Sequence, residues 1–192
     1  ADRPAGGSMS KIKIAIVGVG NCASSLVQGI EYYDGEQEEA GVGLMNWDLG
    51  GYRPGDIEVV AAFDIDVRKV GKDIAEAIFQ PPNCTTIFCE NVAKTGTRVS
   101  MGCTLDGVAS HMADYSEDRS FLPSDEQEPT RQEIIEILVN SGAEILISYL
   151  PVGSEEATKW YVEQILAAKV GMVNCIPVFI AREPYWQKRF ED

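Results

Sequence analysis

The stretch Lys13-Ile14-Ala15-Ile16-Val17-Gly18-Val19-Gly20-Asn21-Cys22-Ala23-Ser24 leads from an apolar strand through Gly-x-Gly-x-x-Ala into the start of a helix. In a dinucleotide-binding turn, Gly18 would permit the tight reversal, Gly20 would let the backbone approach a pyrophosphate, and Ala23 would let the helix pack close to the strand. The pyrophosphate would lie on free backbone N–H groups at the helix N-terminus. Glycine-rich turns also occur for backbone reasons alone, but the flanking strand and helix favour the dinucleotide interpretation.

Strands and helices alternate in the rest of the predicted secondary structure. After the first strand at 12–17, strands are expected at about 57–64, 144–150 and 171–176, and helices at about 22–33, 67–79, 130–140 and from 155 onward. Shorter β-prone pieces lie at 85–88 and 97–100, and the Gly-rich, acidic stretch 34–56 is an insertion after the first helix. This alternation, with right-handed crossovers, predicts an α/β fold with a doubly wound parallel sheet, the Rossmann architecture.

Two of the expected helices begin with polar capping signals. Thr130, with Glu133 three residues later, predicts a capping box. Ser154 is placed to cap the helix that begins at Glu155.

The second strand ends in a carboxylate, Asp64. An acidic residue at this position accepts hydrogen bonds from the adenosine ribose hydroxyls and repels a 2′-phosphate, so Asp64 favours NAD over NADP. Its separation from Gly20 exceeds the usual roughly 20 residues, and the insertion at 34–56 accounts for the excess. A plain capping role for Asp64 or Asp66 at the next helix is the alternative.

Four strand ends carry polar or glycine-rich sequence, at 18–25, 64–66, 148–154 and 174–177. In doubly wound sheets, ligands bind outside the carboxyl ends of the strands, so we expect these segments to converge on one edge. Ser148 and Asn174 could hydrogen-bond a nicotinamide ribose or carboxamide, or could instead satisfy loop backbone.

The composition excludes several classes of partner. The 192 residues carry a formal net charge of −14, which argues against nucleic acid and anionic membranes as partners. No apolar run approaches the roughly 20 residues that cross a bilayer, and no signal-peptide pattern is present, so a cytoplasmic location is expected. Residues 1–10 are interpreted as a leader or cloning remnant and 11–192 as one NAD-binding domain, while the acidic stretches 31–39 and 114–128 are expected to be solvated loops.

A zinc site of the Cys₃His type could in principle use Cys84, Cys89, Cys103 and His111. These residues lack the short Cys-x-x-Cys spacing of structural zinc sites, so no metal is expected. The remaining cysteines, Cys22 and Cys175, are expected to be small buried hydrophobes.

No catalytic residue is assigned from the sequence. There is no Ser/His/Asp set, no pair of carboxylates at the expected strand ends, and no Lys or Arg cluster able to hold a substrate phosphate. His111, the sole histidine, is the lone candidate for a general base.

Several blocks of sequence, in order between Ile12 and about Phe190, resemble the myo-inositol-phosphate synthases of bacterial and archaeal type. They are residues 15–29 around the glycine turn, Ala61-Ala62-Phe63-Asp64, Thr104-Leu105-Asp106-Gly107, Ser148-Tyr149-Leu150-Pro151-Val152-Gly153-Ser154-Glu155-Glu156-Ala157 and Asn174-Cys175-Ile176-Pro177-Val178-Phe179-Ile180-Ala181. The resemblance implies NAD binding and the conversion of D-glucose 6-phosphate to 1L-myo-inositol 1-phosphate (inositol 3-phosphate), by oxidation at C5, aldol cyclisation and reduction. This net isomerisation belongs to inositol and phospholipid biosynthesis.

Residue patterns and resemblance together predict one set of cofactor-binding residues. The set is Gly18, Gly20, Asn21, Cys22, Ala23, Ser24, Asp64, Asp66, Thr104, Asp106, Gly107, Ser148, Leu150, Pro151, Val152, Asn174 and Pro177.

Members of this family are roughly twice as long, and the resemblance implies that a second domain supplies the lysines that hold the phosphate and stabilise the enolate. We therefore expect this chain to bind NAD without turning over substrate, and to meet glucose 6-phosphate only together with that domain. A homo-oligomer, or a second polypeptide carrying the catalytic half, is the expected assembly. The alternatives are a free-standing NAD(H)-binding or sensing module and half of an NAD-dependent dehydrogenase, since fold alone does not fix function.

Overall fold

The computed structural model describes residues 10–34, 41–108 and 110–192, apart from the side chains of His111 and Ala113. Its centre is a five-stranded parallel sheet in the order β3-β2-β1-β4-β5. The strands are β1 (Ile12–Val17), β2 (Ile57–Asp64), β3 (Val99–Met101), β4 (Ile145–Ser148) and β5 (Gly171–Asn174). This strand order is that of a dinucleotide-binding sheet, so the predicted α/β fold is confirmed.

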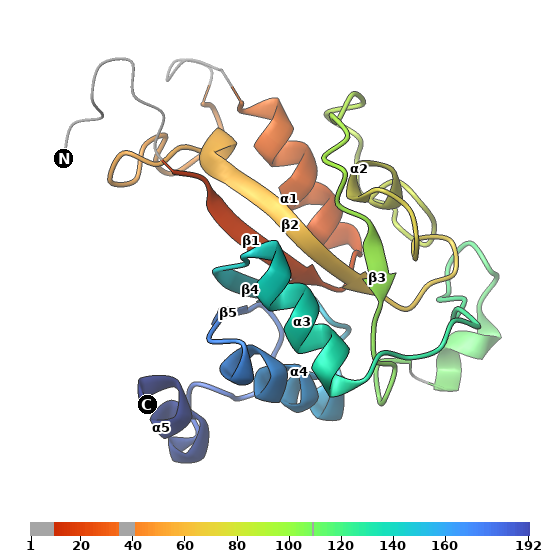
Figure 1. The fold of residues 1–192 in the computed structure, drawn as a ribbon. Helices are drawn as coiled ribbons and strands as arrows, with labels where there is room; N and C mark the ends of the chain where they lie inside the picture. The colour runs from red at the N-terminus through yellow and green to blue at the C-terminus, as the bar shows by residue number, and fades with distance from the viewer. Residues whose placement is uncertain (1–9, 35–40, 109) are drawn as a thin grey trace.

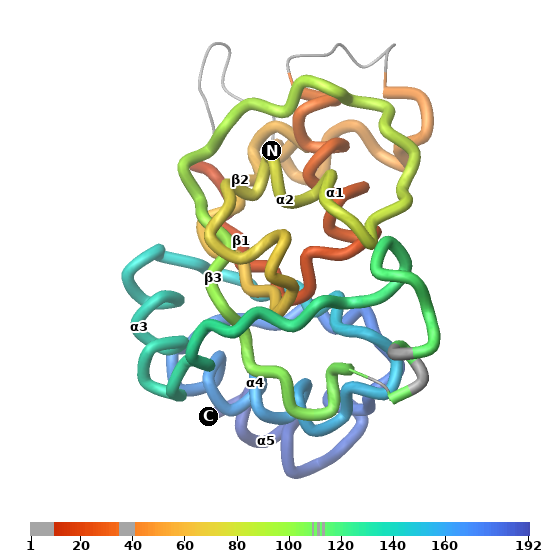
Figure 2. The backbone as a smooth tube through the Cα atoms, turned by 90° about the vertical axis from the view of Figure 1, so that its right-hand side faces the viewer, coloured from red at the N-terminus to blue at the C-terminus, as the bar shows by residue number. Residues whose placement is uncertain are grey.

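Helices cover both faces of the sheet (Figures 1 and 2). They are α1 (Asn21–Tyr32), α2 (Ile74–Ala77), α3 (Arg131–Ser141), α4 (Glu155–Ala167) and α5 (Pro184–Glu191), with 3₁₀ turns η2 (Pro54–Asp56) and η3 (Ser110–Asp114). In Figure 2, α1 and α2 lie above the sheet, whereas α3, α4 and α5 lie below it. Among the described residues, no helix is both long enough and apolar enough to cross a bilayer.

Successive residues of β1 pack into two different cores. Ile14 and Ile16 belong to the cluster beneath α1 and α2, whereas Ala15 and Val17 belong to the cluster beneath α3 and α4. A strand alternates its side chains between the two faces of the sheet, and here both faces are covered. The continuous apolar run of β1 is therefore the pattern that this central position requires.

The direction of the strand order reverses at β1. Val17 at the end of β1 pairs with Phe63 of β2 on one side and with Ser148 of β4 on the other. From β1 the chain winds through β2 to β3, and after β3 it crosses to β4 and β5 on the opposite side of β1. Such a switch point opens a crevice at the carboxyl ends of the strands.

The prediction of one helix over residues 67–79 is wrong. Residues 67–72 form turns, and only Ile74–Ala77 is helical. Gly71 has φ +81°, a left-handed conformation that ends a helical path. Asp73 then adopts an extended conformation and starts α2 by accepting a hydrogen bond from the Ala75 backbone N–H at 3.0 Å.

The structure confirms some of the predicted short strands and the insertion, and contradicts others. The piece at 85–88 contains no strand, the piece at 97–100 overlaps β3, and the last strand ends at Asn174 rather than 176. An insertion does separate α1 from β2, although 35–40 and the leader 1–9 lie outside the described residues, as does part of the acidic stretch 31–39. The other acidic stretch, 114–128, is mostly exposed, as expected for a solvated loop.

The capping box at the start of α3 is confirmed and gives a stability prediction. The Thr130 hydroxyl accepts from the Glu133 N–H at 3.2 Å, and the Glu133 carboxylate accepts from the Thr130 N–H at 2.7 Å. Replacement of Thr130 by Ala removes one cap hydrogen bond and should lower the free energy of unfolding by about 1 kcal/mol. Urea denaturation measures the change.

Thr86→Ala is the matched control, because Thr86 is exposed. Its unfolding free energy should stay within about 0.5 kcal/mol of the parent value. Equal effects of the two substitutions would contradict the capping role.

Candidate functional site

A cavity of about 1060 Å³ lies at the carboxyl ends of the strands. Its size is at the upper end of the range for small-molecule sites, roughly 300–1,000 Å³. Ten residues of the predicted cofactor set line it: Gly18, Gly20, Asn21, Cys22, Asp64, Thr104, Gly107, Leu150, Pro151 and Val152. Segments far apart in the sequence thus converge at the switch point, which is where the fold places a ligand.

The two glycines of the turn meet different surroundings. Gly18 has φ +87°, and a Cβ there would lie 2.7 Å from the Tyr149 carbonyl oxygen, so only glycine fits between β1 and the end of β4. A Cβ on Gly20 would meet nothing within 4 Å, because this position faces the cavity. Gly18 therefore serves the fold, and Gly20 leaves space for a ligand.

The first turn of α1 presents its backbone to the cavity. Gly20 is the N-cap residue, and in the described part of the chain no side-chain cap hydrogen bond forms at this helix start. Unpaired N–H groups at a helix N-terminus attract anions through hydrogen bonding and the helix dipole. This end of α1 therefore suits a phosphate or pyrophosphate.

The Asp64 carboxylate already accepts three backbone hydrogen bonds. One oxygen accepts from Val19 N–H at 2.7 Å, and the other accepts from Ile65 N–H at 2.8 Å and Asp66 N–H at 2.9 Å. The carboxylate also lines the cavity. Because a carboxylate offers about four acceptor positions, Asp64 keeps capacity for a ligand hydroxyl.

Lys69 is a buried cation at this site that the sequence reasoning missed. Its side chain is 1% exposed, and its ammonium donates to the Val19 carbonyl at 2.8 Å and to Asn83 Oδ1 at 2.9 Å. Burial lowers the pKa of the Lys69 ammonium, while the negative charges of Asp64 and Asp66 oppose that shift. No local pattern marks this lysine, because its partners lie in separate segments of the chain.

Asn21 connects α1 to the loop that follows α2. Its side-chain oxygen accepts from Cys84 N–H at 2.8 Å, Thr85 N–H at 3.1 Å and the Thr85 hydroxyl at 3.0 Å. Although Asn21 lines the cavity, its amide oxygen is occupied by this loop. The contact places the segment around Cys84 as one wall of the site.

Asp66 is buried and binds other parts of the protein instead of facing the cavity. It is 0% exposed, pairs with Arg68 at 2.5 Å and accepts from Leu122 N–H at 3.0 Å. Burial by itself would raise the pKa of Asp66, but hydrogen bonds from Arg68 and from backbone N–H groups outweigh it and lower that pKa. Asp66 is not among the lining residues and instead attaches the segment around Leu122 to the end of β2.

Seven residues of the predicted set lie outside the cavity lining: Ala23, Ser24, Asp66, Asp106, Ser148, Asn174 and Pro177. Ala23 packs in the core beneath α1, as the turn motif requires, and the Ser24 hydroxyl accepts from Gln28 Nε2 at 3.1 Å. Ser148 is 1% exposed, and its hydroxyl has no hydrogen-bond partner in the described part of the chain. Asn174 serves its own loop, since its side-chain nitrogen donates to the Val178 carbonyl at 2.7 Å.

Asp106, rather than Ser154, caps α4. The Asp106 carboxylate accepts from Glu156 N–H at 2.8 Å and from Ala157 N–H at 2.9 Å. Ser154 occupies the N-cap position, but its hydroxyl makes no cap hydrogen bond and is unpaired within the described residues. The expected serine cap is therefore wrong, because a carboxylate from the loop after β3 reaches the same N–H groups.

The expectation that Cys22 and Cys175 are buried is also wrong. Both are exposed and line the cavity, because each follows a strand end or helix start at the open edge of the sheet. Among the described side chains, no three His, Cys, Asp or Glu residues are grouped as metal ligands. The side chain of His111, the lone candidate base, lies outside the described residues.

Sequence reasoning missed most of the aromatic and charged lining. Besides Lys69, the missed residues include Phe63, Asn83, Asp118, Arg119, Phe121, Tyr149 and Tyr161. Tyr149 lies within the strand-end segment 148–154 that the sequence predicts to reach the ligand edge, so its position was a usable signal. The 118–121 segment carries no such signal, because Asp66 and Arg68 bring it to the site through long-range contacts.

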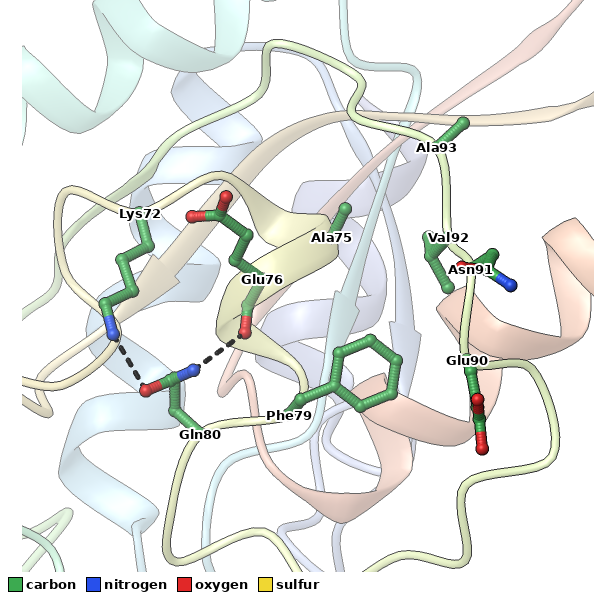
Figure 3. A pocket seen from close by; sticks show the side chains of 9 residues that line it. All are labelled: Lys72, Ala75, Glu76, Phe79, Gln80, Glu90, Asn91, Val92 and Ala93. Carbon is green, nitrogen blue, oxygen red and sulfur yellow. Dashed lines mark hydrogen bonds between the residues drawn. The ribbon is translucent and has the colours of Figure 1, made fainter.

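A second hollow, of about 560 Å³, lies between α2 and the segment 90–93 (Figure 3). Its inner polar groups bind one another: Lys72 donates to Gln80 Oε1 at 2.8 Å, and Gln80 donates to the Glu76 carbonyl at 3.3 Å. The Phe79 ring points toward the 90–93 segment in Figure 3. This hollow lies away from the switch point, so the cavity at the strand ends is the stronger candidate.

Comparison with known proteins identifies relatives along nearly the whole chain, although no family model matches. Inositol-3-phosphate synthase of Corynebacterium glutamicum is 46% identical over 186 residues, which are 96% of this chain and 49% of that protein. Inositol-3-phosphate synthase of Mycolicibacterium smegmatis is 46% identical over 183 residues, which are 95% of this chain and 48% of that protein. The chain thus spans about half the length of the curated relatives it matches.

Solved structures share the fold. The crystal structure of Ari2 gives a TM-score of 0.79 at 32% identity, covering 95% of this chain and 51% of that one. A myo-inositol-1-phosphate synthase-related protein from Thermotoga maritima gives 0.64 at 19% identity, covering 93% of this chain and 51% of that one, a likeness of fold alone. Sequence identity along nearly its whole length shows that the chain belongs to the inositol-3-phosphate synthase family.

Proposed function

We propose that these residues form the NAD-binding part of an inositol-3-phosphate synthase, which converts D-glucose 6-phosphate to 1L-myo-inositol 1-phosphate. The observation that carries the proposal is the cavity at the switch point, which brings the open Gly20 position, the uncapped start of α1 and Asp64 together. Bound NAD would supply the acceptor and donor of hydride for the oxidation and reduction. A cytoplasmic location and a homo-oligomer stay predictions.

The residues present fit the dinucleotide by their chemistry. The first turn of α1 would bind the pyrophosphate, with Gly20 leaving room for it. Asp64 would accept from the adenosine ribose hydroxyls, since its carboxylate lines the cavity. Leu150, Pro151 and Val152 would form an apolar wall against one of the two ring systems of the dinucleotide.

NAD should bind more tightly than NADP, because the Asp64 charge would lie beside a 2′-phosphate. Titration calorimetry with both cofactors measures the preference. Asp64→Ala should weaken NAD binding by about 1–3 kcal/mol, the cost of losing a hydrogen bond to a charged group. Asp64→Asn should narrow the preference, because it removes the negative charge and keeps an acceptor.

Glu58→Gln is the control for this series, because Glu58 is an exposed carboxylate in the first part of the same strand. It should leave both affinities unchanged. Equal affinity of the parent chain for NAD and NADP would refute the role given to Asp64.

Gly20→Val should abolish NAD binding in a folded protein, because the added side chain enters open cavity space rather than protein. Gly18→Ala should instead destabilise the fold, because its Cβ would lie 2.7 Å from the Tyr149 carbonyl oxygen. Circular dichroism and calorimetry separate the two effects. Gly29→Val, at a second position with nothing within 4 Å, is the control and should keep NAD binding; unchanged binding by a folded Gly20→Val protein would show that the turn is structural only.

The 192-residue chain should form no inositol phosphate from glucose 6-phosphate and NAD, whereas a polypeptide of the relatives' full length should form it. Lys69 and Arg119 are the Lys and Arg residues lining the cavity in the described part, and Lys69 is buried against protein acceptors. Ring closure needs cations at the phosphate and at the developing enolate. Phosphate release after periodate treatment measures the product.

Turnover by the 192-residue chain would contradict the proposed division of the enzyme. NAD binding by the full-length polypeptide without product would favour the alternative, an NAD(H)-sensing module.

A further inference from the structure

The segment 117–124, between η3 and α3, lies against the residues that follow β2. Backbone hydrogen bonds join the two in both directions. The Val67 N–H donates to the Leu122 carbonyl at 2.8 Å, and the Ser124 N–H donates to the Ile65 carbonyl at 2.7 Å. We call residues 117–124 the strap, because they are fastened across the end of a strand from which they are distant in the sequence.

The buried pair of Asp66 and Arg68 fastens the strap further. The Arg68 guanidinium donates to the Asp66 carboxylate at 2.5 Å, to the Glu117 carbonyl at 2.6 Å and to the Ser120 carbonyl at 2.7 Å. Asp66, which is 0% exposed, also accepts from the Leu122 N–H at 3.0 Å. A planar guanidinium with five donors can bind all of these acceptors at once, which an ammonium cannot do with the same geometry.

Three residues of the strap line the cavity: Asp118, Arg119 and Phe121. The contacts proposed above for the pyrophosphate and the ribose use none of them. An aromatic ring and a guanidinium both present flat faces that stack on a nucleobase. The side chains that the strap brings to the cavity therefore suit a base.

The strap lies on the side of the cavity where the adenosine is expected. Asp64, at the end of β2, would bind the adenosine ribose, and the start of α1 would bind the pyrophosphate. The base leaves the ribose on the side opposite the pyrophosphate, so it extends past Asp64 and away from α1. The next residue of the lining there is Ile65, to whose carbonyl the strap is bonded through Ser124.

We propose that the strap forms the adenine-binding wall of the dinucleotide site, with Arg119 and Phe121 in contact with the base. Arg68 is a positioning residue, because it is not part of the lining and acts by holding the strap in place. The inference rests on the proposed NAD site and adds the recognition of its base. Leu150, Pro151 and Val152 are then left for the nicotinamide ring.

The first experiment compares three ligands by calorimetry and ligand-observed NMR: NAD, ADP-ribose, which lacks nicotinamide, and nicotinamide mononucleotide, which lacks adenine. Phe121→Leu and Arg119→Gln should each weaken NAD and ADP-ribose by the same factor, about tenfold, the effect of losing one stacking partner. Neither substitution should change the affinity for nicotinamide mononucleotide, because that ligand does not reach the strap.

Phe179→Leu and Arg182→Gln are the matched controls for this series. Phe179 and Arg182 form another Phe–Arg pair, at 5.3 Å from guanidinium to ring centre, and both are exposed and outside the cavity lining. Their replacement should leave all three affinities unchanged.

The second experiment tests the positioning role of Arg68. Arg68→Gln should weaken ADP-ribose about tenfold, and adding Phe121→Leu to it should cost less than about twofold more, because a released strap no longer presents the ring. Hydrogen exchange at the Leu122 and Ser124 amides should be faster in Arg68→Gln, with circular dichroism as the check of folding. If Arg68→Gln does not fold, Arg68→Lys replaces it, since lysine keeps the charge beside Asp66 and lacks the fork.

Arg98→Gln is the control for Arg68→Gln. Arg98 also donates to a distant backbone carbonyl, that of Gly71 at 2.7 Å, and it lies outside the cavity lining. This substitution should change neither the ADP-ribose affinity nor the exchange at Leu122 and Ser124.

Three results would overturn the inference: unchanged ADP-ribose affinity in folded Phe121→Leu or Arg119→Gln, an equal loss of affinity for nicotinamide mononucleotide, or fully additive losses in the double variant. Weaker binding of NADP alone in Arg119→Gln would also overturn it, since Arg119 would then bind a ribose phosphate. Failure of the parent chain to bind NAD would overturn the proposed function itself, so the parent titration separates the two failures.

Discussion

Both polar atoms of Val19, at the centre of the glycine turn, are held by side chains of the second strand and the segment after it. Its N–H donates to Asp64 at 2.7 Å, and its carbonyl accepts from Lys69 at 2.8 Å and from Asn83 at 3.1 Å. Its own side chain is fully buried. The turn is thus fixed before a ligand arrives, which reduces the ordering cost of binding.

The same contacts explain why a buried lysine is tolerated here. Removing an ammonium from water is costly unless it is hydrogen-bonded and near opposite charge. Lys69 has two acceptors, and Asp64 and Asp66 supply the negative charge. The ion pair of Asp66 with Arg68 then extends the charged network to the backbone carbonyl of Ser120, which accepts from Arg68 at 2.7 Å.

Local sequence predicted the sheet well, and ten of the predicted cofactor residues do line the cavity. The apolar run before Gly18, the carboxylate ending β2 and the Thr130 capping box are each encoded within a few consecutive residues, so they were readable. Lys69 was missed because its role depends on Val19, which is distant in the sequence. The apolar spacing at 67–79 suggested a helix, but Gly71 and the cap at Asp73 override that spacing.

The N-termini of α1 and α4 differ in charge. At α4, Asp106 places a full negative charge on the N–H groups of Glu156 and Ala157, and Glu155 and Glu156 add acidic side chains in the first turn. The positive end of that helix is therefore already neutralised from within the protein. The start of α1 has neither a capping side chain nor an acidic first turn. The fields of the two helix starts would therefore direct an anion in the cavity to α1 and away from α4, and a symmetrical diphosphate would have a single preferred position.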